Sequence, residues 1–348
     1  MLGKIKLLLF TLFATSFWAC QNDPILDLDG QQFTNPNAWL VPQNEVIDGG
    51  SGRDGIPSID DPAFSPIAVS NPVFDDRYVL GMSWNGVAKV YPTSILEFHE
   101  IINDDFNGEK IAITFCPLTD TGIAWSRQFG NRITTYGVSG LLYNSNLMPY
   151  DRRTNSTWSQ QKLECVNGPL IGQIPQTFNM VMTTLATLRK AFPNAQILNP
   201  ETGFDRAYGL SPYGEDYRTN DDKILFPISP MDNRLRPKEH VLGLVVDDAA
   251  KAYRFPEQEG IQIISDNVNG QELIIVRSKT DKFMMAFFNE RGLDFTALTD
   301  AWPAIMQDDI GNTYNLVGQI IEGPSLGQRL SAPPSFLGFW FSWSSFFP

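Results

Sequence analysis

Cys116 and His99 are the two residues of this sequence whose types and spacing are best suited to nucleophilic chemistry. Cys116 precedes a proline, which restricts Cys116 to an extended backbone and predicts that it ends a strand. His99 is one of only two histidines and lies one predicted strand earlier. A histidine beside a cysteine can accept the thiol proton and leave a thiolate nucleophile. Cys116 and His99 are therefore candidate catalytic residues.

The same two side chains also support a metal hypothesis. Cys116, His99 and a nearby carboxylate could bind a transition metal such as zinc or copper. In the catalytic alternative, a carboxylate from Glu100, Asp104 or Asp120 could orient the imidazole of His99. A site of three histidines is excluded by composition, and no CxxC or HExxH spacing occurs. A third interpretation is that Cys116 is a small buried side chain with no chemistry, so all three stay open.

A second polar group follows between residues 143 and 160 and mixes hydrogen-bonding side chains with an aromatic face. Such a set suits a small polar ligand or a sugar. The candidate ligand-binding residues are Tyr143, Asn144, Asp151, Arg152, Ser156, Trp158 and Gln160. A surface hairpin with an Asp-Arg pair and a core tryptophan is the alternative interpretation.

The segment that carries His99 and Cys116 has a second, diverged copy later in the chain. Shifting the sequence by 162 positions places residues 79–113 on residues 241–275 with 13 identities. A later echo, GPLIGQ at Gly168 and GPSLGQ at Gly323, suggests that the duplication continues with altered spacing. We assign a first copy to about residues 79–176 and a second to about residues 241–330.

Each copy alternates apolar residues and contains an Asn-Gly turn, at Asn107 or Asn269, so each is predicted to be β-rich. In the second copy Ile261 stands at the position of His99 and Ser278 at that of Cys116. If a site exists, we therefore expect it in the first copy.

The expected fold is a β-rich α+β body of two internally duplicated β-rich lobes with helical connections. Between the copies, residues 177–195 have helical spacing of apolar side chains and are predicted to form a helix ended by Pro193. The aromatic C-terminus, from residue 336, is expected to form a final strand packed in the core, with an exposed aromatic platform as the alternative. GGSG at residues 49–52 predicts a hinge between an arm, residues 20–52, and the domain, residues 53–348.

The N-terminus predicts export and lipidation. Residues 1–19 have a basic start, a short apolar core and a small residue before Cys20, as in a lipoprotein signal peptide. We expect cleavage before Cys20, acylation of its thiol and tethering to a membrane of the cell envelope, most simply the outer membrane. Ordinary secretion with a different cleavage site is the alternative. Residues 20–52 would then be the tether.

Composition limits the partners. The formal net charge of −13 disfavours nucleic acid and anionic lipid, which both require a basic surface. Membrane attachment should therefore depend on acyl chains at Cys20, leaving a small molecule or a polysaccharide as possible ligands. Besides Cys20 the chain has Cys116 and Cys165, so it is no disulfide scaffold, although one disulfide between these two is open.

Several motifs resemble the family of bacterial and archaeal proteins known as domain of unknown function 3179, from about Trp39 to the end. The motifs are DGIPSIDDPAF at Asp54, VLG with VYP at Val79 to Pro92, FHEIIND at Phe98, FCPLTDTG at Phe115, YGVSGLLYNSN at Tyr136, YDRRTNSTWSQ at Tyr150 and FWFSW at Phe339. The resemblance implies no settled activity. Family members often carry a second cysteine in a CPLCGT-like motif, where this chain has Thr119 and Asp120. That departure speaks against a two-thiol mechanism and leaves Cys116 and His99.

Together these features predict a membrane-tethered, extracytoplasmic lipoprotein of unknown activity, with a small-molecule or metal site in the first lobe around His99 and Cys116. A thiol-dependent enzyme is one alternative. A structural or polysaccharide-binding surface lipoprotein is the other.

Overall fold

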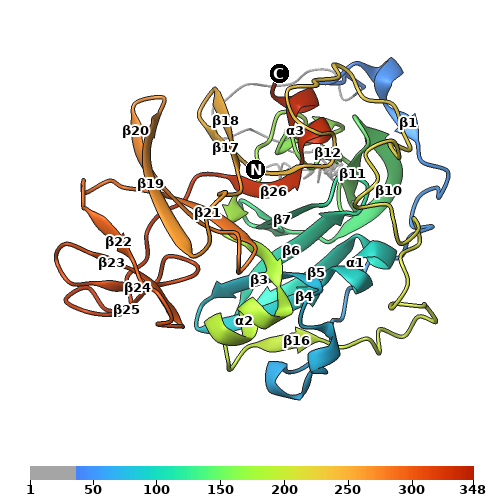
Figure 1. Cartoon of the computed structure of the whole chain (residues 1–348). Coiled ribbons are helices and arrows are strands. Elements are labelled where there is room, and N and C mark those ends of the chain that lie inside the picture. The colour runs from blue at the N-terminus through green and yellow to red at the C-terminus, as the bar shows by residue number, and fades with distance from the viewer. Residues whose placement is uncertain (1–36) are drawn as a thin grey trace, which may run out of the picture. The chain divides into compact units, whose positions relative to one another are not determined.

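The computed structural model describes residues 37–348, which are built mainly of β-strands (Figure 1). The β-rich class expected from the sequence is thereby confirmed. The predicted signal peptide, Cys20 and the tether as far as residue 36 lie outside the described residues.

The first part of the fold is a hairpin, a helix and a three-strand meander. These elements are β3 (Tyr78–Trp84), β4 (Val87–Pro92), α1 (Thr93–His99), β5 (Ile101–Phe106), β6 (Glu109–Cys116) and β7 (Thr121–Ser126). Asn107 and Gly108 both have positive φ, at 51° and 98°, so the β5–β6 connection is the Asn-Gly turn that the sequence predicts. Cys116 ends β6, also as predicted.

A third sheet combines one early strand with the strands that follow β7. It consists of β1 (Ile47–Asp48), β10 (Tyr136–Tyr143), β11 (Asn146–Asp151), β12 (Thr157–Ser159) and β13 (Glu164–Asn167). The small hairpin of β8 (Gln128–Phe129) and β9 (Arg132–Ile133) precedes it. We call residues 78–198 the N-terminal half.

The remaining strands of this half return to the first sheets. β14 (Thr177–Phe178) pairs with β7, β15 (Val181–Thr184) pairs with β3 and continues into α2 (Leu185–Ala191), and β16 (Gln196–Leu198) lies parallel to β4. β2 (Phe64–Pro66) borders β16. Three short 3-10 turns complete this region, η1 (Gln43–Glu45), η2 (Ile67–Val69) and η3 (Pro72–Phe74).

Residues 240–346 make up the C-terminal half. They form β17 (His240–Val246), β18 (Ala249–Arg254), β19 (Ile261–Val268), β20 (Gln271–Ser278), β21 (Phe283–Phe288), β22 (Phe295–Ala297), β23 (Ala304–Asp308), β24 (Thr313–Asn315), β25 (Ile320–Glu322), β26 (Ser335–Phe339) and α3 (Trp340–Phe346). β26 pairs with β17 as β15 pairs with β3.

Two predictions of local structure require correction. The helix predicted over residues 177–195 is only α2, seven residues long, because the preceding VMTT run is rich in β-branched residues and pairs with β3. The side chain of Thr184 then accepts from the amide of Thr187 and caps the helix. At the C-terminus the predicted buried strand is present as β26, but the aromatic residues after it form helix α3 rather than more strand.

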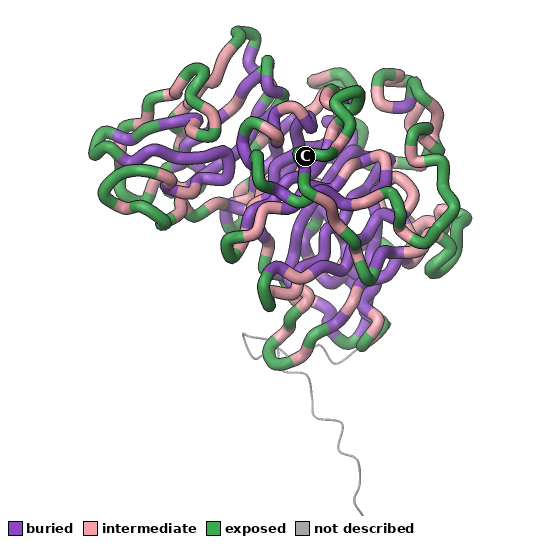
Figure 2. Tube along the Cα trace, turned by 90° about the horizontal axis from the view of Figure 1, so that it is seen from below, coloured by how far each residue is buried: buried purple, intermediate pink, exposed green. Residues whose placement is uncertain are grey.

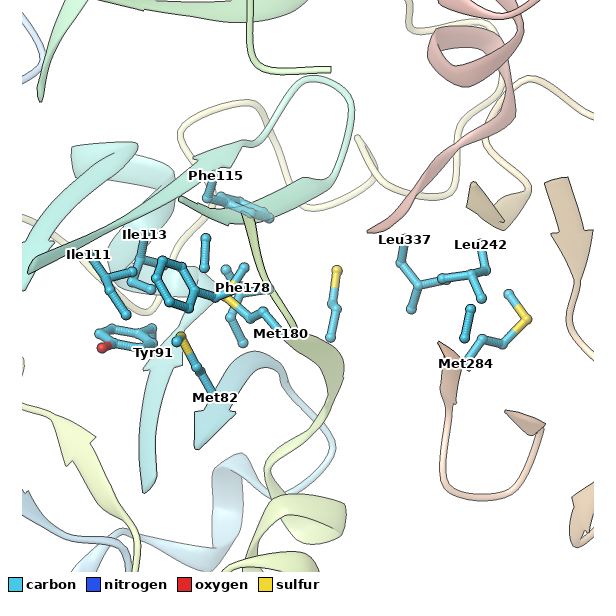
Figure 3. Packing of buried hydrophobic residues seen from close by; sticks show 14 of the residues in the cluster. Met82, Tyr91, Ile111, Ile113, Phe115, Phe178, Met180, Leu242, Met284 and Leu337 are labelled. Atoms are coloured by element: carbon cyan, nitrogen blue, oxygen red, sulfur yellow. The ribbon is translucent and has the colours of Figure 1, made fainter. Parts of the chain in front are cut away.

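The core is shared by the two halves. One buried apolar cluster contains Leu80 and Ile113 of the N-terminal half together with Leu242 and Met284 of the C-terminal half. Figure 3 shows side chains of this cluster from both halves, and Figure 2 shows buried residues gathered in the interior of the tube and exposed residues at its outer loops. Neither half therefore buries its apolar surface alone.

The connection between the halves, residues 199–239, contains no helix or strand and runs along the N-terminal half (yellow in Figure 1). Tyr217 Oη donates to the carbonyl of Leu118 at 2.8 Å, and Ser145 Oγ donates to the carbonyl of Phe226 at 2.7 Å. A structureless segment of this length in a compact fold usually has a function. We call it the covering segment.

Candidate functional site

The structure does not bring Cys116 and His99 together as a hydrogen-bonded pair. His99 Nδ1 lies 2.7 Å from the carbonyl oxygen of Pro57, and His99 Nε2 lies 2.6 Å from Tyr208 Oη. Both ring nitrogens are therefore occupied. Cys116 is 1% exposed and its thiol donates instead to the carbonyl of Ser145, at 3.6 Å.

The environment of Cys116 disfavours a thiolate. Burial, aided by the charge of Glu100, raises the pKa of Cys116 to about 11, although hydrogen bonds with Thr119 act in the opposite direction. At neutral pH the thiol is protonated, and a protonated thiol is a poor nucleophile. Cys165 is also a free, buried thiol, so the disulfide left open by the sequence is not formed here.

The zinc or copper hypothesis for Cys116 and His99 stays a prediction. Between residues 37 and 348, no group of three or more histidine, cysteine or acidic side chains is arranged to hold a metal ion. The Cys116 thiol is hydrogen-bonded to the carbonyl of Ser145 and to Thr119, which offer neutral oxygens and are weaker ligands for these metals.

Three of the candidate ligand residues brace a turn. Asp151 accepts from the amide of Thr154 at 2.7 Å and from Trp158 Nε1 at 3.4 Å. Ser156 Oγ accepts from the amide of Leu170 at 3.0 Å. Asp151, Ser156 and Trp158 are all buried within this network, so they hold the β11–β12 connection in place.

The next three candidates join other segments to the N-terminal half. Arg152 Nη1 pairs with Asp60 at 2.8 Å. Asn144 accepts from the amide of Ser229 at 2.9 Å, which fixes the covering segment. Tyr143 packs edge-on against Phe346 of α3, with ring centroids 5.4 Å apart. These residues therefore do not form one ligand site.

Gln160, the last candidate, belongs to a buried polar network between β6, β7, β11 and the residues after β12. Its members are Thr114, Thr119, Thr121, Asn146, Gln160 and Gln161, each at most 1% exposed. Gln160 Nε2 donates to Thr114 Oγ1 at 2.9 Å, and Asn146 Nδ2 donates to Gln160 Oε1 at 2.8 Å. Gln161 Nε2 donates to Thr121 Oγ1 at 2.8 Å.

This network ends beside Cys116. Asn146 Nδ2 also donates to Thr119 Oγ1 at 3.0 Å, and Thr119 is a hydrogen-bond partner of the Cys116 thiol. In the C-terminal half, Val276 and Phe283 lie 162 positions after Thr114 and Thr121, and both are fully buried. The N-terminal half thus carries polar groups where the C-terminal half has an apolar interior, at a cost that each hydrogen bond must offset.

Glu100 lies near Cys116 and lines a small cavity. The cavity has a volume of about 100 Å³, and its walls include Leu118, Tyr213 and Phe226. The Glu100 residue is 7% exposed and has φ of 56°, a conformation uncommon for a residue with a side chain. We call this cavity the chamber. Glu100 lines it, and Cys116 lies near Glu100 without lining the cavity itself.

The ionisable groups at the chamber are held in their neutral forms. Burial raises the pKa of Glu100 to about 8, so at neutral pH this carboxyl is mostly protonated and can donate a hydrogen bond. Burial and the charges of Glu100 and Cys116 raise the pKa of Tyr213 well above its usual value. The covering segment supplies Tyr213 and Phe226, so it forms one wall of the chamber.

The family model described as protein of unknown function (DUF3179) matches residues 53–348. The chain belongs to this family. No curated protein and no solved structure matches the chain. In the part of this DUF3179 protein that the structure describes, no helix is long and apolar enough to cross a membrane.

A second ionisable cluster in this DUF3179 protein lies where its two halves meet. Asp120 is fully buried, His240 Nε2 lies 2.7 Å from its Oδ2, and Arg218 Nη2 lies 2.8 Å from its Oδ1. Burial alone would raise the pKa of Asp120, but Arg218 and His240 more than compensate and hold it below the ordinary value. The cluster joins both halves and the covering segment.

Sequence reasoning considered Glu100 and Asp120 only as partners for His99 and did not single out Tyr213. The 162-position comparison offered a signal, because Gln262 and Lys282 replace Glu100 and Asp120 in the C-terminal half. These are changes of charge at matched positions. Tyr213 lies in the covering segment, where the internal comparison has no counterpart.

Proposed function

We propose that this protein is a membrane-tethered, extracytoplasmic lipoprotein that binds a small polar molecule in the chamber beside Glu100 and Cys116. The observation that carries the proposal is the Glu100 carboxyl, buried at a cavity and protonated at neutral pH. Strongly perturbed pKa values of buried groups at cavities are typical of functional sites.

The volume and the lining of the chamber limit the size and the chemistry of its ligand. A cavity of about 100 Å³ has room for several water molecules or for a ligand of a few non-hydrogen atoms. A protonated carboxyl donates one hydrogen bond and accepts others, while Leu118 and Phe226 supply apolar contact. We therefore favour a small uncharged molecule with a carbonyl or hydroxyl group over a polysaccharide chain.

The thiol-dependent enzyme is the weaker alternative. It requires a thiolate, whereas burial keeps the Cys116 thiol protonated and His99 is engaged by Pro57 and Tyr208. In our proposal Cys116 is a small buried side chain behind the chamber, next to the polar network, rather than a nucleophile.

We also infer that the domain arose by duplication. The hairpin β3–β4 pairs Val79 with Pro92, and β17–β18 pairs Val241 with Arg254, which are the same positions displaced by 162. The meanders β5–β6–β7 and β19–β20–β21 keep the same displacement throughout their registers. Matching registers in two separate meanders support a common origin.

Side-chain contacts repeat as well. Lys89 and Tyr91 both bind the carboxylate of Asp104, at 2.7 and 2.6 Å. Their counterparts Lys251 and Tyr253 both bind Asp266, at 2.6 and 2.8 Å. The duplication hypothesis gives the chamber an internal reference, because Gln262 and Ser278 replace Glu100 and Cys116 in the second copy.

The tether is proposed from residues 1–20 alone. The expected result is that a full-length protein with Cys20→Ala loses incorporation of radiolabelled palmitate and moves from the membrane fraction to the soluble fraction. Unchanged labelling and fractionation would reject lipidation at Cys20.

The ligand proposal is tested with thermal unfolding in the presence of acetamide, urea, ethylene glycol and acetate. We expect at least one probe to raise the melting temperature of the wild type, with the increase lost in Glu100→Leu. The matched control is Glu109→Leu, a partly exposed carboxylate at the start of β6. If no probe stabilises the protein, or if Glu100→Leu responds like the wild type, the chamber is not the ligand site.

A further inference from the structure

We propose that the protein has a second ligand site, an apolar pocket for an amphipathic carboxylate, lined in part by α1 and by Tyr208 of the covering segment. The pocket has a volume of about 420 Å³ and shares no lining residue with the chamber. It therefore goes beyond the small-molecule site proposed above.

The pocket is built by elements of the N-terminal half and the start of the covering segment. β3, α1, α2 and β16 contribute five apolar side chains to its lining, Val79, Ile95, Leu185, Ile197 and Leu198. Ligand sites in proteins commonly have volumes of about 300 to 1,000 Å³ and mainly apolar walls. The pocket meets both conditions.

The rim of the pocket exposes apolar surface to solvent. Val69, at the end of η2, is 72% exposed, and Phe74, at the end of η3, is 47% exposed, and both line the pocket. Exposed apolar side chains gathered around a hollow mark an interaction site more often than isolated ones do. An apolar ligand body would cover both residues.

One cation at the pocket is free to bind an anion. Arg77 lines the pocket, and its guanidinium makes no ion pair or hydrogen bond to any residue between 37 and 348. The nearby Arg189 differs, because it pairs with Asp75 at 2.9 Å and donates to the carbonyls of Ile67 and Ser70. A guanidinium binds a carboxylate in a bidentate geometry, which gives the ligand its anionic end.

Tyr208, at the start of the covering segment, forms another part of the pocket wall. Its hydroxyl is held by His99 Nε2, at 2.6 Å, and by Thr202. This fixes the phenol ring against the pocket, edge-on to Phe98 with ring centroids 5.6 Å apart. His99 thus positions a wall of this pocket instead of activating Cys116.

The C-terminal half offers a comparison at the helix start. Leu185 is the first residue of α2, and Trp340 is the first residue of α3. Trp340 is 6% exposed, its Nε1 donates to the carbonyl of Asp232 at 3.1 Å, and Arg234 lies over its ring. A bulky indole is accommodated there, whereas Leu185 leaves space in the pocket. Leu185→Trp is therefore a filling substitution suggested by the chain itself.

The test is isothermal titration calorimetry with octanoate and octanol, on the full-length chain carrying Cys20→Ala so that no acyl chain competes. We expect octanoate to bind more tightly than octanol, and Leu185→Trp to abolish the binding of both. Arg77→Gln should lower the affinity for octanoate about tenfold, since the charge-assisted hydrogen bond is lost. The affinity for octanol should not change.

Two further variants separate the outcomes. Phe74→Asp changes an exposed rim residue, so the fold is retained, and it should lower the affinity for both probes. Glu100→Leu should change neither affinity, because Glu100 belongs to the chamber. Absence of octanoate binding, or equal octanoate affinity in the wild type, Phe74→Asp and Arg77→Gln, would overturn the pocket proposal. Failure of the chamber experiment alone would leave it standing.

Discussion

His240 Nε2 lies 2.7 Å from Asp120 Oδ2, and this contact joins the first residue of β17 to the turn after β6. His240 also packs against the ring of Tyr78, at 5.8 Å between ring centroids, and Tyr78 is the residue 162 positions before it. Two residues that are 162 positions apart, Tyr78 and His240, therefore pack against each other where the two halves meet. Asp120 holds this meeting point together with Arg218.

We predict that Asp120→Asn destabilises the fold by about 3 kcal/mol at pH 7, because it leaves Arg218 beside a neutral partner in a buried cluster. The folded-state pKa of Asp120 lies below the ordinary 3.8. Its stabilising contribution is therefore complete above pH 3.8 and is lost as the pH falls through the folded-state pKa. Urea unfolding at pH 7 and pH 3 should show the difference between wild type and variant shrinking in acid.

Asp76→Asn is the control for this experiment, since Asp76 is exposed and should change the free energy of unfolding by less than about 0.5 kcal/mol. Equal stability of Asp120→Asn and wild type at pH 7 would contradict the ion-pair interpretation.

Glu100→Gln should change how the stability of the fold depends on pH between 4.5 and about 8. The folded-state pKa of Glu100 is raised to about 8 from 4.5, so between these values the folded state keeps a proton that the unfolded state has released. Wild-type stability should fall by about 1.4 kcal/mol for each pH unit across this window. Melting temperatures from pH 5 to pH 9 should decline more steeply for the wild type than for Glu100→Gln. Parallel curves would mean that Glu100 ionises normally.

The sequence predicted the parts of the fold that depend on local pattern. The Asn107-Gly108 turn and the strand ending at Cys116 follow from turn residues and from the proline after Cys116. The predicted Cys116–His99 pair depended on side-chain direction, which sequence does not reveal. α1 ends at His99 and turns the imidazole toward Pro57 and Tyr208.

The covering segment could not be placed from sequence. It has no apolar periodicity, so nothing indicated that Tyr213 would wall the chamber or that Arg218 would reach Asp120. The polar network was also only partly anticipated. Gln160 was a candidate, but its partner Thr114 lies on another sheet and 46 residues earlier in the chain.

Gly243→Ala should destabilise the protein by roughly 1–3 kcal/mol. A Cβ atom added at Gly243 would lie 2.0 Å from Cε3 of Trp343, an aromatic ring of α3 packed on β17. Gly209→Ala is the control, because a Cβ there meets nothing within 4 Å. Differential scanning calorimetry should show a lower melting temperature for Gly243→Ala only. An unchanged melting temperature would mean that α3 does not pack closely on β17.

Both thiols of the folded domain should react slowly with iodoacetamide at pH 7.5. Cys116 and Cys165 are buried, and burial raises the pKa of each thiol. Mass spectrometry should find both unmodified in the native protein and both alkylated in urea. Alkylation of native Cys116 faster than free cysteine would instead support the thiol-dependent enzyme.

The contribution of the polar network to stability can be tested by replacing its members with apolar residues like those in the interior of the C-terminal half. Gln160→Leu removes the partner of Asn146 and Thr114 and should destabilise the fold by about 2–4 kcal/mol, because buried polar groups are left unpaired. Leu316 and Val317, both fully buried, directly follow β24, as Gln160 and Gln161 directly follow β12. Adding Thr114→Val should therefore recover part of the loss.

A double-mutant cycle from urea unfolding measures this coupling. If the network acts as a unit, the cost of Gln160→Leu with Thr114→Val should be smaller than the sum of the two single costs by at least about 1 kcal/mol. The residual cost then reflects Asn146, whose Nδ2 still donates to Thr119 Oγ1 but has lost Gln160. Additive costs would show that each hydrogen bond is made independently, and the N-terminal half would then retain these polar groups without cooperative gain in stability.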